Sequence, residues 1–286
     1  MNDKVLACID SRGNTGAVIA WAAWAAQRLD APLEYLHVLE RHPETAAATD
    51  FSGAIGLGAQ ESLLQELSEA DEQRSRGLRE QGRELLARAR AHAAAAGVTR
   101  LDARLRHGDF VDTAIELQQQ VGLYVLGEHH HAEGPGRIHT DHHVERVIRG
   151  VAASVLVATA DDFVPPRQVL IAFDGSPMAR KALAALTRHP LLAGLPVTVV
   201  MAAPDTPSAR QQLKEAQATL AGAGVDAQTE LAPGEPQQVL PALVRARAPA
   251  LLVMGAFGHS RLRQWLLGST TTSLLRMSTV PVLVLR

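Results

Sequence analysis

The sequence predicts an α/β protein made of two tandem, doubly wound parallel-sheet domains. Short apolar runs typical of buried strands alternate with helical segments along the whole chain. The first half of this pattern returns in the second half, and an Asp follows the first strand of each copy. Alternating strands and helices favour parallel sheets, and a repeat this long indicates a domain duplication rather than a solenoid.

The repeat is visible segment by segment. VLACIDSRGNTGAVIAWAAWAAQRL, which begins at Val5, parallels VLIAFDGSPMARKALAALTRHPL, which begins at Val169. LEYLHVLE parallels VTVVMAAP as the second strand, and the closing strands begin at Ala153 and Val280. Ligands of such sheets bind outside the carboxyl ends of the strands, where the strand order reverses. We therefore expect one crevice in each half, beside Asp10 and Asp174.

Composition fits two domains of ordinary size in a chain of 286 residues. We place them at residues 1–160 and 165–286, joined by a short linker with two prolines. A net charge of −2 gives no support for binding nucleic acid or a membrane, and no apolar run is long enough to span one. The single cysteine, Cys8, suits a reducing cytoplasm, and the first residues resemble a strand rather than a signal peptide.

A glycine-rich stretch near the end of the chain carries the strongest functional signal. The apolar run Leu251–Met254 predicts a buried strand, and Gly255 and Gly258 follow it. Gly268 and Ser269 then precede an apolar-periodic segment, as at the start of a helix. Glycines allow a ligand to approach the backbone, and a helix N-terminus suits phosphate. The alternative is an ordinary strand–turn–helix with incidental glycines. The stretch is neither a P-loop, GxxxxGK[ST], nor a Rossmann GxGxxG, and it contains no lysine.

The spacing G-x2-G-x9-G-S, followed by the closing strand Pro281–Leu285, resembles the ATP-binding type of universal stress protein. The resemblance implies the adenine nucleotide alpha hydrolase-like fold and binding of ATP, with Mg²⁺, in the second domain. It also implies a cytoplasmic regulatory or sensor protein that responds to stress through a protein partner, whose identity the sequence leaves open.

The resemblance also implies roles for particular residues of the second half. Asp174 would contact the adenosine end of ATP, with adenine near Val200 or Met201. The backbone at Met254 and Gly255 would approach the ribose, and the residues after Gly255 would hold the phosphates. The full predicted set is Ala172, Phe173, Asp174, Val200, Met254, Gly255, Gly258, His259, Gly268, Ser269 and Thr270. For Asp174 the alternative is a turn or helix-cap carboxylate.

The first half lacks this pattern. Aligning the closing strands places Asp141, His142 and His143 opposite Gly268, Ser269 and Thr270. Gly127 is kept where the second half has Gly255, but a histidine, about His130, replaces Gly258. Because a carboxylate and bulky imidazoles stand where phosphate oxygens would lie, we predict that the first half does not bind ATP.

Histidines gather in that degenerate segment, interleaved with carboxylates. Imidazole and carboxylate ligands suit zinc or nickel, but the spacing matches no metal motif. The metal prediction is therefore open: the segment is a solvated polar loop, a metal site or a site for another anion. The histidines are His129, His130, His131, His139, His142 and His143.

Three further features concern contacts. A long insertion, from about Arg41 through a loop with Gly53, Gly56 and Gly58 into a helix ending near Ala96, is a lid, a homodimer contact or a tolerated surface insertion. The closing strands, Ala153–Thr159 and Val280–Arg286, are expected to pair and make a pseudo-two-fold monomer, an intramolecular pseudo-dimer. Trp21 and Trp24 are expected in the core or at the contact between domains.

Three classes of function remain. The first is the ATP-binding regulatory protein, without catalytic residues. The second is an enzyme, either a slow ATPase assisted by Asp174 and Mg²⁺ or another adenine-nucleotide-dependent enzyme. An ATP pyrophosphatase-type ligase would need an SGGxDS-like loop, whereas this chain has DSRGNT and DGSPMA. The third is an interaction protein that binds no nucleotide.

Overall fold

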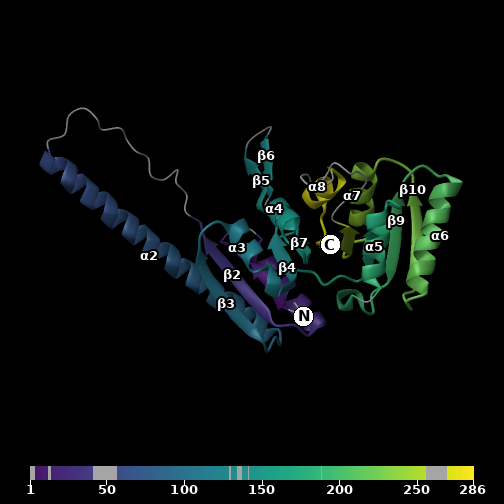
Figure 1. Cartoon of the computed structure of the whole chain (residues 1–286), viewed down its shortest axis with the longest axis horizontal. Coiled ribbons are helices and arrows are strands. Elements are labelled where there is room, and N and C mark those ends of the chain that lie inside the picture. The colour runs from purple at the N-terminus through teal and green to yellow at the C-terminus, as the bar shows by residue number, and fades with distance from the viewer. Residues whose placement is uncertain are drawn as a thin grey trace.

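The computed structural model describes residues 4–11, 14–40, 57–128, 130–133, 137–140, 142–187, 189–255 and 269–286. These residues form one ten-stranded sheet with helices on both faces, and a separate two-stranded hairpin (Figure 1). Among the helices of these ranges, none has the length and apolar character needed to cross a bilayer.

The sheet contains the predicted duplication. Its strand order is β10-β9-β8-β11-β12-β7-β4-β1-β2-β3. Each half is parallel within itself, and its first strand lies centrally, as in a doubly wound sheet. The first half supplies β1 (Lys4–Cys8), β2 (Leu33–Leu39), β3 (Leu101–His107), β4 (Val121–Gly127) and β7 (Ser154–Ala158). The second half supplies β8 (Val169–Ala172), β9 (Val197–Ala202), β10 (Ala227–Ala232), β11 (Leu251–Gly255) and β12 (Val282–Leu285).

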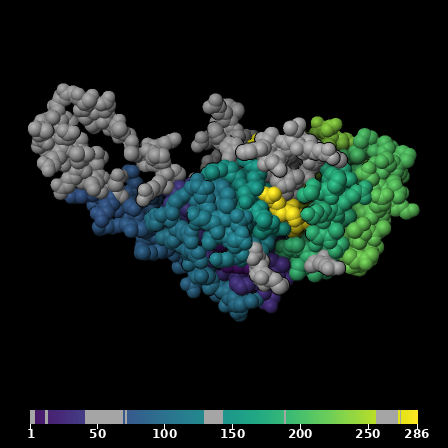
Figure 2. Space-filling view, in the orientation of Figure 1, coloured from purple at the N-terminus to yellow at the C-terminus, as the bar shows by residue number. Residues whose placement is uncertain are grey.

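The two halves join through their closing strands, as the sequence predicts. β7 and β12 are antiparallel, and Leu156 lies opposite Leu283. Both leucines are fully buried, because helices cover the sheet on each face. Figure 2 shows the last residues of the chain, in yellow, between the two halves. The seam therefore turns two five-stranded sheets into one and leaves neither closing strand as an open edge.

Helices cover the two faces of the sheet in matching sets. Alternate strand residues point to opposite faces, so each face has its own apolar core. One face is covered by α1 (Thr15–Leu29), α2 (Leu57–Ala95), α5 (Pro177–Leu186), the 3-10 helix η3 (Pro190–Leu192) and α6 (Pro207–Ala221). The other is covered by α3 (Phe110–Glu116), α4 (His142–Gly150), α7 (Pro236–Ala246) and α8 (Ser269–Met277), with the 3-10 helix η2 (Gln118–Gln120) after α3.

The two tryptophans lie at the contact between the halves. Trp21 is only 2% exposed, and its ring packs edge-on against Trp24 and against Phe163 of the linker, with centroids 5.1 and 4.8 Å away. Arg28 lies over the Trp24 ring and donates a hydrogen bond to the backbone oxygen of Ala193, just after η3. The predicted alternatives for these tryptophans, core and domain contact, both hold.

The long insertion contains a 39-residue helix, α2. It begins at Leu57, so the prediction that Gly58 lies in the preceding loop is wrong, while Gly53 and Gly56 fall outside the described residues. Only its last third packs on the sheet, and the earlier part projects away from it (Figure 1). The close approach of α2 to strands β2 and β3 depends on Gly82, because a Cβ there would lie 2.8 Å from His37 Cδ2 and 2.9 Å from Leu105 Cδ1.

The histidine-rich segment is not simply a loop, which corrects the prediction. β5 (His130–Glu133) and β6 (Arg137–Thr140) form an antiparallel hairpin in which His131 lies opposite His139. Sequence patterns do not identify this hairpin, because its strands are short and mostly polar.

Candidate functional site

Several of the predicted nucleotide residues of the second half, among those that the structure describes, come to one edge of the sheet. Ala172 ends β8 and pairs with Val200 of β9, while Met254 and Gly255 end the neighbouring strand β11. Val200 and Met254 are both buried on the face covered by α7 and α8. The carboxyl ends of three adjacent strands therefore meet there, at the edge where doubly wound sheets bind ligands.

Asp174 lies in the turn between β8 and α5. Its Oδ1 accepts a hydrogen bond of 3.0 Å from the Ser176 N–H, and its side chain is exposed. Gly175 has a φ of +72°, and a Cβ there would overlap the Gln212 side chain, so the turn requires glycine. The turn-carboxylate role considered for Asp174 is thus present, and it fixes the carboxylate at the crevice edge.

Phe173 contributes its backbone rather than its ring to this edge. Its N–H donates to the backbone oxygen of Val200 at 2.9 Å. The ring is buried in the core beneath α5 and α6, with the Arg180 guanidinium 5.9 Å from its centroid. A ligand at the crevice would therefore meet the Phe173 main chain.

The glycine loop itself falls largely outside the described residues. Gly258, His259 and Gly268 are in residues 256–268, whereas Ser269 and Thr270 begin α8 as predicted. Gly255 can be assessed. A Cβ there would lie 3.7 Å from Ala182 Cβ and 4.0 Å from the Met178 backbone oxygen, which are ordinary contacts.

The matching glycine of the first half, Gly127, has a different environment. A Cβ there would overlap Asn14 Oδ1 and lie 3.0 Å from Val18 Cγ2. Asn14 precedes α1, but its side chain makes no cap bond; instead Nδ2 donates to the backbone oxygens of Glu128 at 3.0 Å and Ala158 at 2.9 Å. The Asn14 carboxamide thus fills the space between α1 and the ends of β4 and β7.

Sequence analysis missed Asn14. The repeat places Asn14 opposite Met178, so a polar side chain replaces an apolar one there. The role of that side chain could not be predicted, because its hydrogen-bond partners are at strand ends distant in the chain. The alignment of the two halves correctly matches the helices before the closing strands. α4 begins at His142, and α8 begins at Ser269, the residue aligned with His142.

A cavity of about 190 Å³ lies at the carboxyl ends of β1, β2 and β4; we call it the N-terminal cavity. Glu40 Oε1 accepts from the Phe110 N–H at 3.2 Å and lies 3.9 Å from His143 Nδ1. The His143 ring stacks on Phe110, with centroids 5.8 Å apart. His37 is buried beside them, with Nδ1 2.7 Å from the Ile9 carbonyl, so this nitrogen carries the proton.

Cys8 and the histidines of this half give no metal centre among the described side chains. Burial, aided by the charge of Glu34, raises the pKa of the Cys8 thiol, which therefore stays protonated at neutral pH. No group of three or more His, Cys, Asp or Glu side chains in the described ranges has a metal-binding arrangement. His129 and Asp141 lie outside those ranges.

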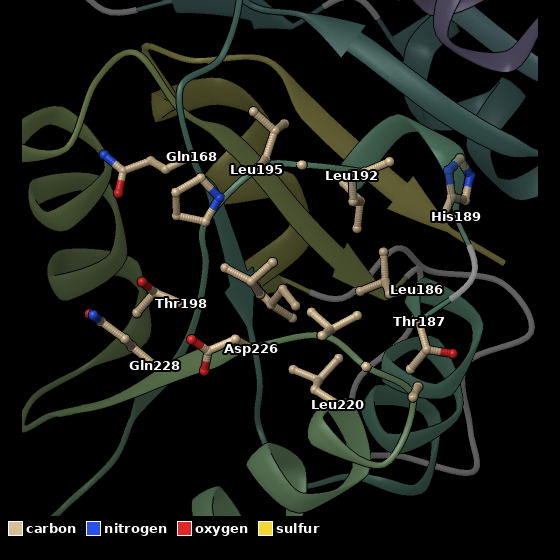
Figure 3. Close-up of a pocket in the computed structure, with 18 of the residues that line it drawn as sticks. Gln168, Leu186, Thr187, His189, Leu192, Leu195, Thr198, Leu220, Asp226 and Gln228 are labelled. Atoms are coloured by element: carbon tan, nitrogen blue, oxygen red, sulfur yellow. The ribbon is translucent and has the colours of Figure 1, made fainter.

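A larger, open cavity of about 1040 Å³ lies at the opposite edge of the second half, beside the amino ends of β8, β9 and β10. Thr198 and Gln228 lie across it from Leu186 and Thr187 (Figure 3). At its rim, burial lowers the pKa of His189, whose Nδ1 is buried without a hydrogen-bond partner in the described part of the chain. Of the predicted nucleotide residues that the structure describes, none lines this cavity.

Comparison with known proteins agrees with the duplicated fold. The model of the universal stress protein family matches residues 1–159 and 197–286, which include strands of both crevices. The chain belongs to the universal stress protein family. Universal stress protein Slr1230 of Synechocystis sp. (strain ATCC 27184 / PCC 6803 / Kazusa) is 30% identical to it over 286 residues, covering 99% of each chain.

Solved structures of the family share the fold over the whole chain. A universal stress protein from Archaeoglobus fulgidus DSM 4304 has a TM-score of 0.70 at 19% identity, covering 100% of this chain and 97% of its own. A protein from Pseudomonas aeruginosa UCBPP-PA14 has a TM-score of 0.63 at 20% identity, covering 99% and 92%. The duplication is therefore shared by other universal stress proteins of this length.

Proposed function

We propose that this universal stress protein binds ATP, with Mg²⁺, in the crevice of its second domain, residues 165–286. It would act in the cytoplasm as a regulatory protein, in which the bound nucleotide controls contact with a protein partner. The first domain, residues 1–160, would not bind ATP.

The observation that carries the proposal is the position of the two ends of the glycine motif that the structure describes. Gly255 ends β11 at the ligand-binding edge of the sheet, and Ser269 begins α8, so residues 256–268 connect that edge to a helix N-terminus. A helix N-terminus offers unpaired N–H donors and the positive end of its dipole, which suit phosphate. Asp174, fixed by its turn, lies at the same edge for the adenosine end.

The residues present fit this ligand in the second half and not in the first. Around Gly255 the protein makes only ordinary contacts, so packing alone does not demand a glycine there. At Gly127 the Asn14 side chain fills the matching space, and Glu40 adds a carboxylate that would repel phosphate. One ATP per chain is the expected stoichiometry.

The test is a titration of nucleotide-depleted protein with Mg-ATP. In the double variant Gly268→Val/Ser269→Ala we expect affinity to fall more than about tenfold, because the valine side chain would block phosphate from the backbone N–H groups and the Ser269 hydroxyl donor is lost. The matched first-half variant, Asp141→Val/His142→Ala, should leave affinity unchanged. Equal affinity in all three proteins would refute the proposed site.

The same proteins decide whether ATP is also hydrolysed. Slow hydrolysis, with Asp174 and Mg²⁺ assisting, predicts phosphate release that stops in Gly268→Val/Ser269→Ala. If both proteins release phosphate at the same rate, the protein binds ATP without acting as an ATPase.

A further inference from the structure

The part of α2 that precedes its contact with the sheet is turned to solvent. Near the end of the helix, Leu85, Leu86 and Ala89 are buried on the sheet. All described residues from Glu69 to Leu78 are exposed, and the earlier part of the helix extends beyond the sheet (Figure 1). Helices in proteins are stabilised mostly by packing, so a long stretch of α2 lacks its usual source of stability within the described part of the chain.

Charge is segregated along this helix. We call residues 61–72 the acidic segment and residues 74–83 the basic segment. The acidic segment contains five carboxylates and no basic residue, whereas the basic segment contains four arginines and one glutamate. The two segments therefore have opposite net charge. The carboxylates of the acidic segment are Glu61, Glu66, Glu69, Asp71 and Glu72, and the arginines are Arg74, Arg76, Arg79 and Arg83.

This segregation is unfavourable for a helix that stays alone in water. Like charges three or four residues apart repel, as in the spacing of Glu69 and Glu72. Attractive pairs within the helix join Glu72 to Arg76 at 2.8 Å and Glu80 to Arg83 at 3.6 Å. All four of these side chains are more than half exposed, so the two pairs contribute little to stability. A guanidinium has five N–H donors and keeps some of them for further carboxylates.

A second copy of the same helix supplies both complementary charges. In an antiparallel pair, the acidic segment of one copy lies beside the basic segment of the other, and two-fold symmetry makes this contact twice. A parallel pair would bring like charges together. A partner of one charge sign would match only one of the two segments. The acidic segment also has three leucines in its twelve residues, and arginine stems can cover apolar surface.

We propose that the protein forms a two-fold dimer in which two α2 helices pack antiparallel over residues 61–83. The overlap is about 35 Å long, or about three heptads. This contact is separate from the seam between the closing strands and from the proposed ATP site, and it depends on neither.

The test is sedimentation velocity of the full chain between about 1 and 100 µM. We expect a concentration-dependent change from a 30.5 kDa monomer to a dimer at about 0.05 M salt. Because the contact is between exposed charges, the dissociation constant should be at least about tenfold higher at about 0.5 M salt. A protein that stays monomeric at about 100 µM in low salt would overturn the proposal.

Charge reversal assigns the dimer to α2. Glu66→Lys/Glu69→Lys/Glu72→Lys makes the acidic segment basic, and Arg76→Glu/Arg79→Glu makes the basic segment acidic. Each variant alone should dimerise at least about tenfold more weakly than the native protein, because its two segments no longer attract each other. An equimolar mixture of the two should form a heterodimer, which a merely misfolded protein would not do.

A matched control makes the same charge change elsewhere. Lys181→Glu/Lys214→Glu, at exposed positions on α5 and α6, should dimerise like the native protein. Unchanged melting temperatures in both α2 variants would show that the sheet core is intact. Native-like dimerisation of either α2 variant alone, or a mixture of the two that stays monomeric, would overturn the proposal.

Discussion

The two crevices occupy equivalent positions in the repeat, but they differ in packing. The space beside the strand-ending glycine is filled by a side chain in the first half and is not crowded in the second. Each crevice lies at the carboxyl ends of the strands of its half. A glycine that ends the fourth strand, Gly127 of β4 or Gly255 of β11, lies beside it. At Gly127 the Asn14 side chain requires the glycine, whereas Gly255 has only ordinary contacts around it. The same residue type therefore serves internal packing in one half and, in our proposal, ligand approach in the other.

The difference in packing begins at the helix that follows the first strand of each half, α1 or α5. In the second half Ser176 Oγ accepts the Ala179 N–H at 3.1 Å and caps α5. In the first half Asn14 precedes α1 without a cap bond, and its amide instead joins the ends of β4 and β7. In our proposal, the Asn14 carboxamide at the ends of β4 and β7 closes the first crevice to nucleotide.

The largest expected effect tests the seam that holds both crevices in one sheet. Leu283→Ala should lower the free energy of unfolding by about 2–5 kcal/mol, because the side chain is fully buried against the first half. The matched change at an exposed leucine, Leu78→Ala, should cost less than about 0.5 kcal/mol. Denaturant unfolding measures both, and equal costs would contradict the seam's role.

The next effect compares the two glycines directly. Gly127→Ala should cost about 1–3 kcal/mol, because the new Cβ would overlap Asn14 Oδ1. Gly255→Ala should cost less than about 0.5 kcal/mol, because its Cβ has room. Neither glycine has a positive φ, so backbone strain does not contribute to the difference between the two unfolding free energies. A larger cost at Gly255 would refute the packing account.

A double-mutant cycle sharpens the same point. Asn14→Ala alone should cost about 1–3 kcal/mol, since two backbone oxygens lose their donor. In that background Gly127→Ala should cost at least about 0.5 kcal/mol less than in the native protein, because the overlapping oxygen is gone. Strict additivity, measured by the same unfolding curves, would show that the two residues do not compete for this space.

A smaller effect lies away from both crevices, at His189. Burial lowers its pKa in the folded protein from the ordinary 6.5, so the unfolded chain binds the proton more tightly. The stability from this group is present above pH 6.5 and is lost as the pH falls through and below that value. His189→Gln should therefore flatten the decline in unfolding free energy between about pH 7 and pH 5. An unchanged slope would show that another group is responsible.

The sequence was sufficient for the architecture and insufficient for the first crevice. Buried strands alternating with helices, and the duplication itself, predict the sheet and the pairing of the two closing strands, because they depend on local periodicity and symmetry. Asn14 could not be found in this way, because its partners, Glu128 and Ala158, are distant in the chain. The hairpin containing His131 has strands of only 4 residues each, which are too short and too rich in histidine and charged residues to be identified by periodicity.

The central claim is that only the second crevice holds ATP. The direct measurement is the nucleotide released, per chain, when gently purified protein is denatured and the supernatant is separated by ion exchange. The account predicts about one ATP per chain in the native protein and none in Gly268→Val/Ser269→Ala. Two nucleotides per chain, or none together with no affinity for added Mg-ATP, would contradict it.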